Sequence, residues 1–137
     1  MSIETNKALA RAAIDATNRG DADKAVEFDA PDVLLNGEPF GREADRQRTV
    51  MMAAAFPDGQ WIIDDLIAED DKMLLRWTFR GKHQGALPSI PVPPSGKEIV
   101  FSGLSLYRFA DGQIIEVWEG YDRFTLLQQL GAVPQTA

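Results

Sequence analysis

The sequence is short of three kinds of side chain that often carry chemistry: it has no cysteine, a single histidine, and fewer basic than acidic residues. The lack of cysteine excludes disulfides, thiolate nucleophiles and cysteine-bound metals. The 14 lysines and arginines against 21 aspartates and glutamates give a formal net charge of -7. Such a negative field repels phosphate backbones and anionic lipid headgroups, so we expect neither nucleic acid nor a membrane as a partner.

Long hydrophobic runs and cofactor motifs are also absent. No apolar stretch approaches the ~20 residues that span a bilayer, and the N-terminus has no signal-peptide core, so we expect a cytoplasmic protein. There is no glycine-rich phosphate loop, no G-x-S-x-G elbow and no metal-ligand spacing around the one histidine. We therefore expect no metal and no organic cofactor.

The sequence does contain enough apolar material for one core. Of its 137 residues 45% are hydrophobic, which predicts a single domain over residues 1–137. Helical spacing of apolar side chains dominates the first part of the chain. It predicts an amphipathic helix between a cap at Ser2 and a stop at Gly20, a short helix over 21–29, a brief strand over 33–35 and a helix over 42–56.

From Trp61 onward the apolar spacing becomes alternating, which predicts strands. Runs 61–68 and 73–80 flank an acidic turn and form a first hairpin, in which Met73, Leu75, Trp77 and Phe79 share one buried face. Runs 98–109 and 113–122 flank an Asp-Gly pair, which is a strong signal for a second hairpin.

Two other segments complete the predicted architecture. Residues 87–96 carry four prolines, which exclude a regular strand and favour a stiff loop that could form a pocket rim. Residues 123–130 have helical spacing and stop at Gly131. Helices before a long antiparallel sheet indicate an α+β arrangement with helices packed on one face of the sheet.

Several segments of the second half match a known family in their order and spacing. They are AFPD at 55–58, DLIAEDDKMLLRWTFRGKHQG at 65–85, FSGLSLYRFADGQIIEVWEGYD at 101–122 and LLQQLG at 126–131. Together they resemble the SnoaL-like polyketide cyclases of the NTF2-like superfamily, over roughly the last two thirds of the chain.

The resemblance implies a cone-shaped α+β barrel, in which N-terminal helices pack into a curved antiparallel sheet and close an apolar pocket. It also implies a homodimer, a hydrophobic or aromatic small-molecule ligand and no cofactor. The founding members close the last ring of aromatic polyketides by an intramolecular aldol condensation that uses an acidic side chain. Two positions depart from the family pattern: Glu119 stands where an aspartate is frequent, and Asn36 where many members have a pocket histidine.

Asp122 and His83 are the catalytic candidates, because the resemblance places an acid/base residue and a histidine at these positions. Alternation along the strand puts Asp122 on the face of Trp118 and Glu119 on the opposite face. A carboxyl beside an indole is partly desolvated, which raises its pKa and suits a base that removes a proton next to a carbonyl. Structural roles are open for both: Asp122 could cap the final helix, and His83 could lie at a solvated strand end.

The candidate substrate-binding residues are Trp118, Trp77, Phe101, Tyr107 and Asn36. The four aromatic side chains offer faces on which a polycyclic ligand can stack, and Trp118 is the preferred pocket wall. The amide of Asn36 could orient a substrate carbonyl. Core packing competes as the explanation for the aromatic residues, and a turn with Gly37 is the better explanation for Asn36.

The leading functional hypothesis is a small-molecule cyclase or isomerase with cofactor-free acid/base catalysis. Asp122 would remove a proton next to a carbonyl, and aldol-type ring closure or a double-bond shift of the ketosteroid-isomerase type would follow. An epoxide hydrolase would need an Asp, Arg and Asp set around a water, and Arg76 and Arg80 lie on the strand face opposite Trp77. The alternative from another class is a non-catalytic module that binds a hydrophobic small molecule.

Overall fold

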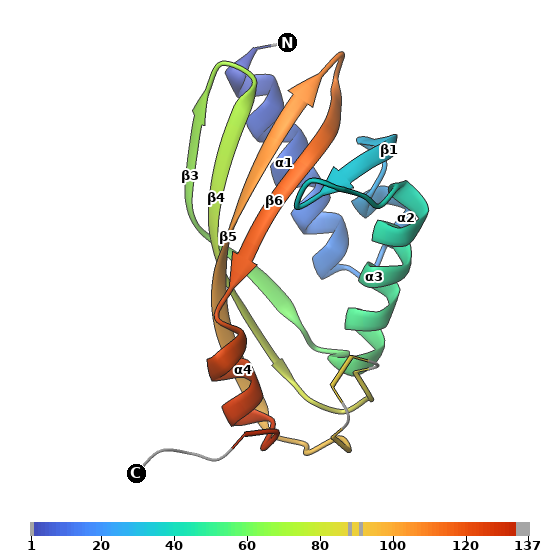
Figure 1. Ribbon diagram of the computed structural model, residues 1–137, viewed down its shortest axis with the longest axis vertical. Helices are drawn as coiled ribbons and strands as arrows, with labels where there is room; N and C mark the ends of the chain where they lie inside the picture. Colours follow the sequence, from blue (N-terminus) through green and yellow to red (C-terminus); the bar gives the residue numbers. More distant parts are fainter. Residues whose placement is uncertain (1, 88, 91, 134–137) are drawn as a thin grey trace.

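The computed structural model describes residues 2–87, 89–90 and 92–133. Its elements in chain order are α1 (Ile3–Asn18), α2 (Ala22–Ala25), β1 (Asp29–Leu35), β2 (Glu38–Pro39), α3 (Arg42–Ala55), β3 (Gln60–Glu69), β4 (Lys72–Lys82), β5 (Glu98–Ala110), β6 (Gln113–Tyr121) and α4 (Arg123–Gln129). Figure 1 shows the long strands β3 to β6 bending around one side, with α1 and α3 on that concave side. The predicted α+β class is confirmed.

The strands form one curved sheet in the order β2-β1-β6-β5-β4-β3, which is open rather than closed into a full barrel. Most neighbours pair antiparallel as predicted, but β1 runs parallel to β6. The register shifts between Ile63 and Asp65 in β3, and again opposite Arg108 and Phe109, where Ile115 is an extra residue of β6. Such bulges bend a strand locally, so they contribute to the concavity.

Both predicted hairpins are present, and the turn of the second one has the backbone angles that its sequence predicts. Asp111 and Gly112 have φ of 51° and 76°, the positive pair that a two-residue type I′ turn requires. Asn36 and Gly37 repeat this pattern, with φ of 52° and 82°, between β1 and β2. Turn formation therefore accounts for the sequence Asn36-Gly37.

The helix predictions hold except for the second helix. It ends at Ala25 instead of reaching 29, and Asp29 already belongs to β1, which we expected to begin at Val33. The reason is tertiary, because the Phe28 carbonyl accepts the N–H of Ile114 and aligns this segment with β6. Within the described residues, no helix is both long and apolar enough to cross a membrane.

The core lies against the concave face of the sheet. Met73, Leu75, Trp77 and Phe79 are all buried, as the alternation in β4 predicted. Burying each such side chain contributes roughly 1.5–3 kcal/mol. Gly103 faces Trp77 in the neighbouring strand, and a Cβ there would lie 2.6 Å from the indole, so only glycine leaves room for this ring.

Candidate functional site

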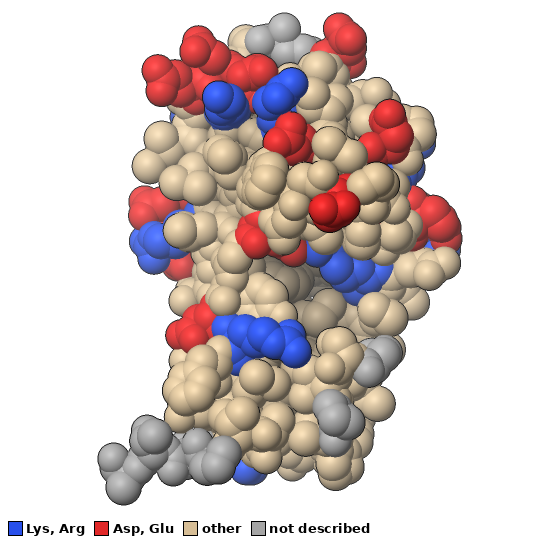
Figure 2. All heavy atoms as spheres, viewed as in Figure 1, with Lys and Arg blue, Asp and Glu red and all other residues tan. Residues whose placement is uncertain are grey.

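A hollow of about 380 Å³ lies between the concave face of the sheet and helices α1 and α3. Figure 2 shows this face of the molecule hollowed near its middle, with acidic and basic side chains around the opening. Most of the lining is apolar and includes Ile14, Met52, Phe56, Trp61, Leu75 and Leu126. The loop between the hairpins contributes Leu87, Ser89 and Ile90 to the wall, whereas Pro88 and Pro91 lie outside the described residues.

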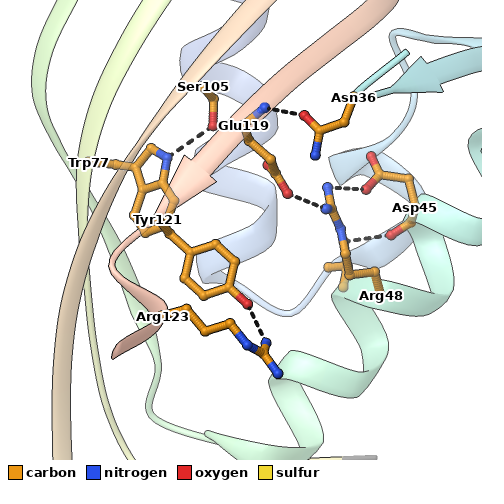
Figure 3. A network of polar contacts seen from close by, with 9 residues as sticks. Asn36, Asp45, Arg48, Trp77, Ser105, Glu119, Tyr121 and Arg123 are labelled. Carbon is orange, nitrogen blue, oxygen red and sulfur yellow. Dashed lines mark hydrogen bonds and ion pairs between the residues drawn. The ribbon is translucent and has the colours of Figure 1, made fainter. Parts of the chain in front are cut away.

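Three charged side chains interrupt this apolar lining. Arg48 of α3 donates from Nη1 to Glu119 Oε1 of β6 at 2.5 Å and from Nη2 to Asp45 Oδ1 at 2.8 Å. Figure 3 shows Glu119 pointing from the strand toward Arg48, which is held between the two carboxylates. Burial alone would lower the pKa of Arg48, but the two carboxylates outweigh it and raise this pKa, so the guanidinium stays charged.

Asp29, at the start of β1, adds a third carboxyl group to the wall of the hollow. Its exposed fraction is 4%, and its Oδ2 is buried without a hydrogen-bond partner among the described residues. Burial, then the hydrogen bond with Asp45 and the repulsion by its charge, raise the pKa of Asp29 to about 9, although Arg48 and Arg42 act in the opposite direction. The surroundings of Asp29 therefore favour the neutral form of its carboxyl.

Three of the predicted substrate-binding residues line the hollow: Trp77, Phe101 and Tyr107. Trp77 is also part of the core, and its Nε1 donates to Ser105 Oγ at 3.0 Å. Burial raises the pKa of Tyr107, so its phenol stays protonated and available as a donor. These residues give the hollow an aromatic wall that carries hydroxyl groups.

Trp118, Asn36 and Asp122 lie instead around a shallow depression on the outer face of the sheet. The inward orientation predicted for Trp118 is wrong, because this side chain is 46% exposed while Glu119 points into the hollow. Asn36 Oδ1 accepts the main-chain N–H of Glu119 at 2.8 Å, so it fixes the backbone of β6. The homodimer stays a prediction. The outer face of the sheet, where Trp118 is exposed, is the surface that we expect to form its interface.

Asp122 is the N-cap of α4. Its Oδ1 accepts the N–H of Thr125 at 3.0 Å and its Oδ2 accepts the Thr125 hydroxyl at 2.7 Å. These hydrogen bonds lower the pKa of Asp122, which corrects the expectation that a neighbouring indole would raise it. The desolvation needed for a raised pKa is missing because the carboxylate is open to solvent.

The capping role predicts a specific pH dependence. Asp122→Ala should lower the melting temperature at neutral pH, and Asp122→Asn should lower it less because asparagine also caps helices. Since the pKa of Asp122 in the folded protein lies below its usual value of 3.8, the contribution is present above about pH 4 and is lost as the pH falls through the lowered pKa. Thermal unfolding at a series of pH values measures this, and equal melting temperatures for wild type and Asp122→Ala would contradict the role.

His83 is fully buried and does not appear among the described residues that line either hollow. Its Nδ1 accepts the N–H of Ser95 at 3.2 Å, and its ring lies 5.7 Å from that of Phe56. Its main chain also bonds to Lys97 and Gly96. His83 therefore does not lie at a solvated strand end. It is buried, and its hydrogen bonds hold the loop between β4 and β5 in place.

The sequence reasoning missed Asp29, Asp45 and Arg48 and placed Glu119 on the wrong face. Two signals were available: Asp45 and Arg48 are three apart in a helix with a narrow apolar face, and Asp29 stands between apolar Phe28 and Ala30. Arg76 does lie between two carboxylates, those of Asp64 and Asp65, but this set is exposed to solvent, and the set that lines the hollow comes from α3 and β6. Within the described residues, no group of three or more His, Asp or Glu side chains could hold a metal ion.

Comparisons with known proteins agree with this architecture. A family model for SnoaL-like polyketide cyclases matches residues 7–130. AclR from Streptomyces galilaeus, a proposed hydroxylase, is 28% identical with a TM-score of 0.87, and the match covers 97% of this chain and 100% of AclR. TsrD from Streptomyces laurentii is 26% identical with a TM-score of 0.88, covering 97% and 99%.

IdmH from Streptomyces antibioticus, a proposed polyketide cyclase, is a further structural neighbour. It is 28% identical with a TM-score of 0.78, and the match covers 91% of this chain and 97% of IdmH. A comparison with curated proteins found no match.

Proposed function

Since the chain belongs to the SnoaL-like polyketide cyclase family, we propose that it performs cofactor-free acid/base catalysis on a hydrophobic small molecule with a carbonyl group. The observation that carries this proposal is the carboxylate of Glu119, which is 22% exposed and lines a mostly apolar hollow. A carboxylate that faces a bound ketone can remove the proton on the carbon next to the carbonyl. In the proposal Glu119 is this base.

Arg48 supports the chemistry in two ways. Its hydrogen bond fixes one oxygen of Glu119, so that the other oxygen is free to face the substrate. Its charge also lies close to where an enolate oxygen would develop, and a fixed positive charge in an apolar site stabilises such an anion. Ring closure by an aldol step or a double-bond shift would follow from the same enolate.

The substrate class follows from the wall of the hollow. Trp77, Phe101 and Tyr107 present aromatic surfaces, and the remaining lining is mostly aliphatic. Flat, fused-ring ketones match such a wall because offset and edge-to-face ring contacts are favourable. The Tyr107 hydroxyl is an additional donor for a substrate oxygen.

Asp122 and His83 remain alternative acid/base candidates, supported by the family positions. For Asp122 to act, a substrate would have to bind at the outer depression, and its carboxylate would have to leave Thr125. For His83 to act, the loop that it tethers would have to open. Glu119 needs neither change, which is why the proposal prefers it.

Hydrolysis of an epoxide is a second candidate function, favoured by one observation. Arg48 stands between the carboxyl groups of Asp45 and Glu119. In such an arrangement one carboxylate can take a proton from a water while the other carboxyl, in its protonated form, gives a proton to the ring oxygen. Turnover of a polycyclic epoxide to a diol, with no proton exchange on the matching ketone, would favour this function over the cyclase or isomerase.

The alternative from another class is a module that binds its ligand without turnover. The enzyme and the non-catalytic module both require the ligand to bind in the hollow. Two neighbouring alanines of α1 allow a direct test of this binding site. Ala13 lines the hollow and its neighbour Ala12 is exposed. Ala13→Phe should weaken the binding of anthrone, a tricyclic ketone, by at least tenfold, or ~1.4 kcal/mol, while Ala12→Phe leaves it unchanged.

Binding is followed by the fluorescence of Trp61 and Trp77, which line the hollow. Equal affinity of wild type and Ala13→Phe would show that anthrone binds elsewhere, and the proposed site would be wrong. Binding that depends on Ala13, without any proton exchange on the ligand, would favour the non-catalytic module.

A further inference from the structure

The carboxyls of Asp29 and Asp45 both line the hollow, and they are close enough that hydrogen bonding to Asp45 and its charge raise the pKa of Asp29. They come from different elements, β1 and α3, so the tertiary fold alone brings them together. Asp29 is 4% exposed, whereas the side chain of Asp45 is 22% exposed and reaches the hollow. The pair therefore has a buried member and a member that a ligand can touch.

The surrounding charges neutralise only part of this acidic group. Arg48 is shared by Asp45 and Glu119, which already balance its charge. Arg42, the other nearby cation of α3, donates from Nε at 2.9 Å to the main-chain oxygen of Asp29 rather than to its carboxyl. Among the described residues no ion pair involves the Asp29 carboxyl, and its Oδ2 has no hydrogen-bond partner.

Two carboxyls in hydrogen-bond contact cannot both be ionised when no cation compensates the second charge. The bond itself needs a proton, because a carboxylate is only an acceptor. Burial assigns this proton to Asp29, whose O–H then donates to Asp45. The result is a proton stored beside an apolar hollow that also contains the proposed base, Glu119.

We propose that Asp29 stores a proton and passes it through Asp45 to an oxygen of the bound substrate, so that the site supplies a general acid opposite its base. This inference rests on the proposed function and deepens it. Asp45, which touches the substrate, is the catalytic acid, and Asp29 acts through it. The substrate class is a fused-ring compound with two carbonyl groups, and the reaction is one whose product carries a new hydroxyl.

The proton balance of the step closes without a further reactant. Glu119 takes a proton from the carbon next to the first carbonyl, and that carbon forms a bond to the second carbonyl carbon. The electron pair of the second C=O moves to its oxygen. Asp29 passes its proton to the Asp45 carboxylate, and Asp45 then delivers this proton to that oxygen. Protonated Glu119 then returns a proton through solvent, and the acidic pair is restored.

A double-bond shift needs no acid for a carbonyl oxygen, because the proton that the base removes returns to another carbon. The stored proton therefore distinguishes ring closure from isomerisation.

Infrared spectroscopy of the unliganded protein tests the stored proton without any knowledge of the substrate. Wild type should show the carbonyl band of a protonated carboxyl at neutral pH, and the band should disappear as the pH rises past about 9. Asp29→Asn should lack the band. Asp32→Asn, which changes an exposed aspartate of the same strand, and Glu119→Gln should both retain it.

No band at neutral pH in wild type, or a band that survives in Asp29→Asn, would overturn the proposal. Because Glu119 takes no part in this readout, the result is independent of whether the proposed base is correct.

A kinetic comparison tests the direction of the proton transfer. Asp29→Asn should slow the ring closure of an aromatic diketone by ~10²-fold or more, and by at least tenfold more than the double-bond shift of a β,γ-unsaturated ketone. Glu119→Gln should slow both reactions. Equal effects of Asp29→Asn on the two probes would mean that Asp29 acts on structure alone, whereas unchanged rates in Glu119→Gln would contradict the proposed function instead.

Discussion

Glu119→Gln is expected to lower kcat for proton exchange by ~10²- to 10⁴-fold, the usual contribution of a general base. Glutamine keeps the size of the side chain and can still contact Arg48, but it cannot accept a proton from carbon. The affinity for the ketone should therefore stay within about tenfold. The measurement is deuterium uptake on the carbons next to the carbonyl of 2-tetralone, followed by NMR, together with the dissociation constant.

Two variants make this result specific. Glu116 lies on the same strand, but its carboxylate faces outward and bonds to Trp118 and Arg108, so Glu116→Gln should leave exchange unchanged. Asp122→Asn tests the residue that the family position assigns. If Asp122→Asn lost proton exchange while Glu119→Gln kept it, Asp122 would be the catalytic base, and the substrate would bind on the outer face of the sheet.

Asp29→Asn is expected to stabilise the fold, by an amount that grows as the pH rises. The unfolded chain releases the Asp29 proton above about pH 4, whereas the folded protein keeps it until about pH 9. Within that window the unfolded state binds fewer protons, so each pH unit costs the wild type up to about 1.4 kcal/mol of unfolding free energy. Asparagine stays neutral and avoids this cost.

Urea unfolding of both proteins between pH 5 and about pH 9 measures the difference. Below about pH 4 the two stabilities should converge, because Asp29 is then protonated in both states. Asp32→Asn is the matched control and should follow the wild type throughout, since Asp32 is exposed. A difference that is independent of pH would mean that Asp29 is ionised in the folded protein.

The two predictions together describe an exchange of stability for function. A carboxyl kept neutral in the core costs folding free energy at physiological pH, yet the same proton is what the proposed acid needs. Asp29→Asn should thus give a more stable and less active protein. If Asp29→Asn is more stable than the wild type but closes the ring at the same rate, the buried Asp29 carboxyl takes no part in catalysis.

Much of the fold could be predicted because short-range rules decide it. Asp111-Gly112 and Asn36-Gly37 have the residues that positive φ angles require, and their turns set the hairpins. Alternation from Met73 to Phe79 identified the buried face of β4, since apolar residues occupy every second position there. The boundaries of α3 and α4 followed from Pro57 and Gly131.

The candidate site could be predicted only where burial and aromatic character coincide. Trp77, Phe101 and Tyr107 were identified and do line the hollow, because strongly apolar strand residues face the concave side. In β6 the pattern was misleading, since Trp118 is exposed and the carboxylate of Glu119 faces inward. A large aromatic side chain is usually buried, but the register shift in β6 breaks the alternation, so that Ile114, Val117 and Glu119 line the hollow and Trp118 faces outward.

The sequence by itself determined the period of each element, the turns between the strands and, where no register shift interrupts the alternation, the side chains that share a face of a strand. Only the tertiary structure decided which face of β6 is concave, because alternation is symmetric until helices pack against one side. It also decided that Asp29, Asp45, Arg48 and Glu119 meet, because they come from β1, α3 and β6. Electrostatic coupling among these residues depends on distance in space, and no local pattern in the chain encodes that distance.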